Sequence, residues 1–277
     1  MWGTRSLVNA PEAYELIQRA AFTEGMCIPP ALSNNSLHVF STAEAVECLS
    51  PNMQGRNISV IISGDSYNKQ LFVGLADVLL GRAWNAQIKG GPARLKALSD
   101  TQRDLERRHR LDPSFPNIQF LCQRECYGRM LPFSETCSHC INAFTEQNQD
   151  TVAVVGAGVH IMQELKDELN STVEELKKFL VMANRTIFNS MPSYQIEKVP
   201  KKYKDAPQNK LSTTVYHELL QYLAPHSPEH PFVDFFQLTK SCFMNNCSSD
   251  GGHRSRYVNR WKAQLLLNTI CEVSEQA

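Results

Sequence analysis

The stretch that decides the fold runs from Asn57 to Phe72 and reads Asn-Ile-Ser-Val-Ile-Ile-Ser-Gly-Asp-Ser-Tyr-Asn-Lys-Gln-Leu-Phe. Its first part is rich in β-branched residues, which predicts a buried strand of a parallel sheet. The strand pattern ends at Ser63-Gly-Asp-Ser66, and apolar residues then recur at helical spacing to about Leu80. This arrangement places Ser66 at the carboxyl edge of the sheet, at the positive end of a helix dipole. On this stretch alone, Ser66 is either the N-cap of the helix or a nucleophile whose oxyanion the dipole stabilises.

The rest of the chain repeats this alternation of strand and helix. Further strands are predicted at 116–122, 151–160, 179–188 and 232–238. Helices are predicted from Ser41 or Thr42, with Glu44 or Glu47 in the first turns, and at 102–110, 159–180, 213–223 and 257–272. The pattern predicts a three-layer α/β/α fold around a mostly parallel sheet of about five strands. We place an irregular or helical lead-in at 1–47 and the domain at 48–277.

The composition is that of an ordinary globular chain. Its 277 residues, 42% hydrophobic and 20% charged, suffice to bury a large core. Lysine plus arginine and aspartate plus glutamate number 28 each, so no charge excess points to nucleic acid or a membrane surface. No apolar run has the length of a transmembrane helix. The charged segment at 102–110 is predicted to be a solvated helix face, with a polyanion site as the alternative.

The sequence gives two opposing indications of cellular location. The N-terminal residues lack the apolar segment of a signal peptide, which favours the cytoplasm. Nine cysteines and five Asn-x-Ser/Thr sequons favour the secretory pathway instead. We therefore expect the lumen of the endoplasmic reticulum or Golgi, or secretion, with this chain as the C-terminal part or a short form of a longer protein. A cytoplasmic location remains the alternative.

Four of the nine cysteines are clustered, and their spacing allows three kinds of chemistry. Disulfides are favoured if the chain is luminal, a structural zinc fits four nearby thiols, and Cys137-Ser-His-Cys140 is spaced as a redox pair. The cluster comprises Cys122, Cys126, Cys137 and Cys140.

Two more cysteine pairs are candidates for disulfides. Cys242 and Cys247 can close a short loop ahead of the last helix. Cys48 and Cys271 can join the two ends of the domain. With nine cysteines, at least one remains unpaired or bonds to another chain.

A second candidate site segment precedes the closing helix, where Asp250 and His253 stand three residues apart in a glycine-containing loop. A serine hydroxyl becomes a good nucleophile when an imidazole takes its proton, and a carboxylate orients that imidazole. One loop can supply both groups to Ser66. Taken alone, such a pair is in most cases a surface acid and a solvated histidine.

Gly64-Asp-Ser66 after the first strand, together with Asp250-Gly-Gly-His253 before the last helix, resembles the SGNH/GDSL hydrolase superfamily. More narrowly, the chain resembles the PC-esterase branch, which includes the neurexophilin-and-PC-esterase and cadherin-like-and-PC-esterase proteins. The resemblance also rests on Gly158-Val-His160, Val233-Asp-Phe-Phe-Gln-Leu-Thr239 and Gln264-Leu-Leu-Leu-Asn-Thr-Ile-Cys271. It covers the chain from about residue 45 to the end.

The resemblance implies that Ser66 is the nucleophile, His253 the general base and Asp250 its orienting carboxylate. It also implies an oxyanion hole built from the Ser66 N–H, a glycine after the second strand and an asparagine after the third. Gly128 is our candidate for that glycine. The third-strand motif here lacks the asparagine, so we expect the Gly158 N–H or His160 to supply its donor.

The function implied is that of a serine acyl-esterase or O-acyltransferase, without a cofactor, acting on an O-acyl, especially O-acetyl, group of a carbohydrate or glycoprotein. The alternative is a catalytically inactive SGNH-fold binding module of a larger secretory-pathway protein. Arg254 and Arg256 follow His253 and either bind an acidic group of the substrate or face solvent. A zinc-stabilised intracellular binding protein is a third interpretation, based on the clustered cysteines.

Overall fold

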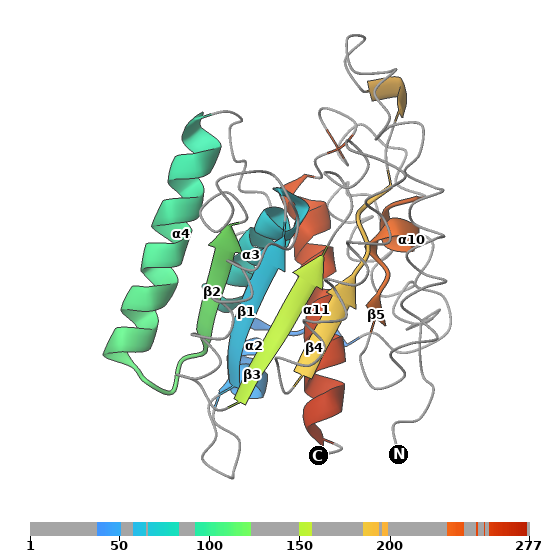
Figure 1. Ribbon diagram of the computed structural model, residues 1–277. Coiled ribbons are helices and arrows are strands. Elements are labelled where there is room, and N and C mark those ends of the chain that lie inside the picture. Colours follow the sequence, from blue (N-terminus) through green and yellow to red (C-terminus); the bar gives the residue numbers. More distant parts are fainter. Residues whose placement is uncertain are drawn as a thin grey trace, which may run out of the picture.

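The computed structural model describes residues 38–50, 58–64, 66–82, 92–122, 150–156, 185–193, 196–198, 232–240, 248, 252 and 255–275. Figure 1 shows these elements as one sheet with helices packed against it. In chain order they are α2 (Thr42–Leu49), β1 (Ile58–Gly64), α3 (Ser66–Leu79), α4 (Pro92–Leu111), β2 (Asn117–Cys122), β3 (Asp150–Gly156), β4 (Arg185–Asn189), the 3-10 helix η1 (Ile196–Lys198), β5 (Phe232–Val233), α10 (Phe235–Lys240) and α11 (Arg256–Glu275).

The five strands form one sheet in the order β2-β1-β3-β4-β5, and every neighbouring pair is parallel. This confirms the predicted α/β fold class and the parallel sheet of about five strands. The chain leaves β1 toward β2 and then continues on the other side with β3. In doubly wound sheets, ligands bind at the carboxyl edge where the strand order reverses in this way. Here that position lies between the ends of β1 and β3.

Both faces of the sheet are covered at its centre. Every residue of β1 is buried, and so is every residue from Thr151 to Gly156 of β3. Because alternate side chains of a strand point to opposite faces, burial of all of them requires cover on both sides, as in a three-layer fold. Figure 1 shows α2, α3 and α11 on one face. The helices predicted at 159–180 and 213–223 lie outside the described residues.

The helix α2 begins where the sequence predicted it. Ser41 is its N-cap, with an extended backbone, and the Glu44 N–H donates to the Ser41 hydroxyl at 3.3 Å. In return, the Ser41 N–H donates to the Glu44 carboxylate at 2.7 Å, which completes a capping box. The backbone N–H and then the hydroxyl of Ser41 lower the pKa of the Glu44 carboxyl.

The predicted fifth strand at 232–238 is wrong beyond its first two residues. Only Phe232 and Val233 pair with β4, and the helix α10 begins at Phe235. The sequence Phe235-Phe-Gln-Leu-Thr239 has buried residues at spacings of one, three and four, which suits one face of a helix as well as a strand. The fourth strand, predicted at 179–188, is found at Arg185–Asn189, and its predicted residues 179–184 lie outside the described part.

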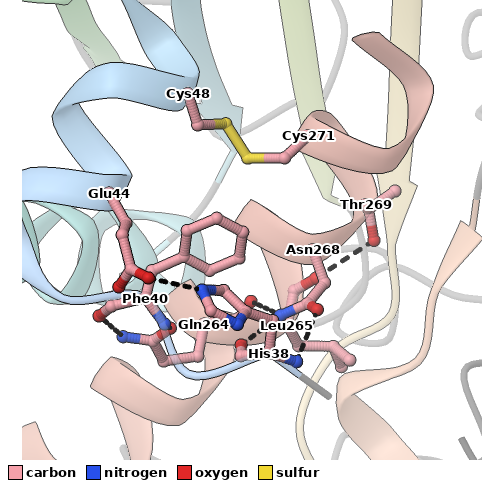
Figure 2. Close-up of a disulfide and its surroundings, with 9 residues drawn as sticks. All are labelled: His38, Phe40, Glu44, Cys48, Gln264, Leu265, Asn268, Thr269 and Cys271. Atoms are coloured by element: carbon pink, nitrogen blue, oxygen red, sulfur yellow. Dashed lines mark hydrogen bonds and ion pairs between the residues drawn. A yellow bond between two sulfur atoms is a disulfide. The ribbon is translucent and has the colours of Figure 1, made fainter. Parts of the chain in front are cut away.

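Figure 2 shows how the first described residues are fastened to the closing helix. Cys48 and Cys271 form a disulfide with their Cα atoms 5.8 Å apart, which confirms the predicted pairing. Gln264 accepts from the Phe40 N–H at 2.8 Å and donates to the Phe40 carbonyl at 3.0 Å. Asn268, one turn later, makes the same pair of bonds with the backbone of His38. Residues 38–47, assigned to the lead-in on sequence, therefore pack on the domain and contribute Ala45 to its core.

Candidate active site

Ser66 lies at the carboxyl edge of the sheet, at the position that the sequence predicted. It is the first residue of α3, separated from the end of β1 by a single residue, and it is partly exposed. The N-terminal end of a fourteen-residue helix stabilises negative charge beside it. The location therefore suits an oxyanion on the reacting atoms.

Two glycines, one in the turn that leads to Ser66 and one at the end of β3, leave space that a side chain would fill. Gly64, at the end of β1, has φ of 151°, a backbone conformation that side chains disfavour. A Cβ added to Gly64 would lie 2.6 Å from the Asn68 amide nitrogen and 2.7 Å from the Gly156 carbonyl oxygen. A Cβ added to Gly156, at the end of β3, would lie 2.5 Å from both the Asn68 and the Asn189 amides. The two glycines thus make room for two asparagine side chains at the crevice between β1 and β3.

These asparagines form what we call the amide pair, Asn68 of α3 and Asn189 of β4. The Asn189 amide donates to the Asn68 oxygen at 2.8 Å, and the Asn68 amide donates to the Ser63 carbonyl at 2.6 Å. Both side chains are buried, with exposed fractions of 1% for Asn68 and 6% for Asn189. The amide pair therefore joins the ends of β4 and β1 to the first turn of α3. Sequence reasoning missed it.

The next polar group along the same edge involves Ser190. Its hydroxyl donates to the Asp234 carboxylate at 3.2 Å and accepts from the Phe236 N–H at 2.8 Å. These bonds tie the end of β4 to the start of α10. One signal in the sequence could have pointed to both groups, since Asn189-Ser190 and Asp234 are polar residues at or directly after the ends of β4 and β5.

Most of the other predicted site residues lie outside the described residues. The structure therefore does not report whether they meet Ser66. They are the proposed catalytic residues Asp250 and His253, the oxyanion candidates Gly128 and Gly158, the substrate-binding candidates His160 and Arg254, and the cysteines Cys126, Cys137, Cys140, Cys242 and Cys247. Cys122 is described by its backbone alone, as the last residue of β2.

Two described residues belong to the loop that carries Asp250 and His253. Gly252 is buried. Ser248 is buried as well, and its carbonyl accepts from the Lys198 ammonium of η1 at 3.2 Å. Ser248 is thus in contact with the connection that follows β4, on the carboxyl side of the sheet.

Neither expectation for Arg256 holds, because its side chain forms an ion pair with Asp77 of α3. Asp77 is fully buried and is shared with two more arginines. Arg82 approaches its carboxylate at 3.4 Å, and Arg260 approaches it at 3.8 Å while also donating to the Asp77 carbonyl. We call Asp77, Arg82, Arg256 and Arg260 the charged cluster. It lies at the opposite end of α3 from Ser66.

A groove of about 380 Å³ lies near this end of α3, away from Ser66. It is partly basic, yet Asp104 offsets some of that charge through an ion pair with Arg82 at 2.7 Å. The residues that line it are Leu80, Arg82, Asp104, Arg107, Arg108 and Leu111.

Within the described ranges, no group of three or more His, Cys, Asp or Glu side chains is arranged to hold a metal ion. The zinc alternative for the cysteines at 122–140 is left untested, since those side chains are not described. None of the described helices is both long and apolar enough to cross a bilayer.

Comparisons with known proteins add no assignment. Neither the scan against protein-family models nor the search of curated proteins gave a match to this chain.

Proposed function

We propose that the protein is an SGNH-type serine acyl-esterase or O-acyltransferase that acts on an acylated carbohydrate or glycoprotein through Ser66, His253 and Asp250. The observation that carries the proposal is the position of Ser66. It is the first residue of α3, at the carboxyl edge of a parallel sheet, where the strand order reverses between β1 and β3. In doubly wound folds, ligands bind at this position of the sheet.

The mechanism would begin with attack of the Ser66 Oγ on the acyl carbonyl. His253 would take the hydroxyl proton, and Asp250 would hold the imidazole in the required tautomer. The N–H groups at the start of α3 would stabilise the tetrahedral oxyanion. Collapse of this intermediate breaks the ester bond, and the proton passes from His253 to the leaving alcohol. Water or a second sugar hydroxyl then takes the acyl group from Ser66, which gives hydrolysis or transfer.

The charged cluster sets a condition on this mechanism. Asp77 follows Ser66 by eleven residues on α3, which corresponds to roughly 16 Å along the helix axis. His253 precedes Arg256, the partner of Asp77, by three residues, and three extended residues span at most about 10 Å. The chain before Arg256 must therefore run toward the start of α3, with side chains closing the remaining distance. If it does not, the alternative function as a non-catalytic binding module is favoured.

The structure also bears on location in a limited way. One disulfide is present among the described residues, and disulfides persist mainly in oxidising compartments. The proposal therefore includes a site of action in the secretory pathway or outside the cell, with the cytoplasm as the alternative.

The test is active-site labelling of the purified, secretory-expressed protein with a fluorophosphonate, located by mass spectrometry. We expect a covalent adduct on Ser66 in the wild type, no adduct in Ser66→Ala and a much slower reaction in His253→Ala. Thermal unfolding of each variant serves as the control for folding. A folded wild type that does not react would overturn the enzyme function and leave the binding module.

A further inference from the structure

The amide pair is buried and hydrogen-bonded, but one of its atoms is not satisfied. The Asn189 Oδ1 has no hydrogen-bond partner among the described residues, and the side chain is 6% exposed. A buried polar atom without a partner costs stability, so its presence calls for a structural or functional reason. Both asparagines also require a glycine beside them, since a Cβ at Gly64 or Gly156 would overlap their amides. Apolar side chains would fill this space at a lower cost in folding stability.

The hydrogen bonds of the amide pair converge on the turn that presents Ser66. Asn68 is the third residue of α3, and Ser66 is the first. The Asn68 amide holds the Ser63 carbonyl, so it bridges from the first helical turn back across the residues that lead into it. Asn189, at the end of β4, donates a hydrogen bond to the oxygen of the same Asn68 amide. Hydrogen bonds to β1 and β4 thus fix the orientation of the first turn of α3 relative to the sheet.

We infer that Asn68 and Asn189 are positioning residues for the Ser66 nucleophile. This inference rests on the proposed function. The pair sets the direction of the Ser66 hydroxyl and of the N–H groups at the start of α3, without contact with substrate. Reactions of this type depend on placement of the reacting atoms to within a fraction of an ångström, and a misplacement of about 1 Å can lower the rate about 100-fold.

The experiment compares Asn68→Ala and Asn189→Ala with the wild type in fluorophosphonate labelling of Ser66 across a range of pH. A positioning role predicts that the plateau rate falls about tenfold to 100-fold. The pH midpoint should stay unchanged, because it reports the general base. Rates are divided by the folded fraction, measured by thermal unfolding. Asn189→Ser is used if the alanine variants do not fold.

The matched control is Thr101→Val. Thr101 is buried, and its hydroxyl accepts a hydrogen bond from Arg82 at 2.9 Å, near the other end of α3. Its loss should lower the melting temperature while the labelling rate stays at the wild-type value.

The outcomes separate the two proposals. Normal labelling of folded Asn68→Ala and Asn189→Ala, alongside a reactive wild type, would overturn the positioning role and leave the serine mechanism intact. An unreactive wild type would overturn the serine mechanism, and the positioning role would fall with it.

Discussion

The two ends of helix α3 are both buried and polar, but they are built from different groups. At the N-terminal end, two neutral asparagine amides and two glycines surround the turn before Ser66. At the C-terminal end, the single carboxylate of Asp77 is shared by three arginines. One helix thus carries a neutral hydrogen-bond network at its start and a charged one at its end.

The difference lies in what each network can do. A buried charge is costly unless an opposite charge accompanies it, so the charged cluster makes the folded state strongly dependent on its members. Burial lowers the pKa of the Arg260 guanidinium, and repulsion by Arg256 and Arg82 adds to this, while Asp77 opposes it. Neutral amides are less costly to bury and have directional bonds. We therefore infer that the charged cluster mainly contributes to the stability of the fold. The amide pair mainly fixes the geometry of the turn before Ser66.

The largest expected effect is that of Asp77→Asn. It leaves Arg260, which is almost fully buried, and Arg256 without their counter-charge, so the free energy of unfolding should fall by about 3–5 kcal/mol. Chemical denaturation measures the loss. The labelling rate of Ser66 per folded molecule should not change.

Asp104→Asn is the control for this prediction. Asp104 also pairs with Arg82, but its side chain is 54% exposed, so its loss should cost less than about 1 kcal/mol. Equal losses in the two variants, or a reactivity loss in Asp77→Asn, would remove the distinction between the two ends of α3.

The second prediction concerns the disulfide that fastens α2 to α11 on the same face of the sheet. The Cys48→Ser/Cys271→Ser double variant should lose about 2–5 kcal/mol of stability, since the bond closes a loop with a sequence separation of 223 residues. Urea unfolding with and without reductant measures this, because reductant should affect the wild type more than the variant. If the variant matches the oxidised wild type, the hydrogen bonds from Gln264 and Asn268 suffice to hold this face.

Apart from the control variants, the smallest effect is expected in the middle of α3, at Gly74. A Cβ there would lie 2.2 Å from the Asn259 carbonyl oxygen of α11, a backbone atom that can move only with its helix. Gly74→Ala should lower the free energy of unfolding by about 1–3 kcal/mol through this overlap, even though alanine favours helix. Calorimetry would measure the change. A gain in stability would show that α3 and α11 do not cross as closely as the structure indicates.

Much of the fold was predictable because its signals are local. The β-branched run at 58–62 identifies the central strand, and Ser41 with Glu44 identifies a helix start. The closing helix, predicted at 257–272, is found at Arg256–Glu275. The strand prediction for 232–238 was wrong beyond its first two residues. A short run of apolar residues fits both a strand and a helix, and only packing in the folded chain decides between them.

The sequence by itself determined the α/β class and the position of Ser66 at a strand-to-helix turn. It offered Cys48 with Cys271 as one candidate disulfide, which the structure confirmed. The tertiary structure alone decided which polar residues surround that turn. Asn68 and Asn189 are 121 positions apart, and Asp77 and Arg256 are 179 apart, so no local pattern relates them. Considered singly, Arg256, three residues after the candidate histidine, suggested a substrate or solvent contact. The order of the strands in the sheet and the crossing of α3 and α11 determine which of these residues meet. Both are properties of the packed chain.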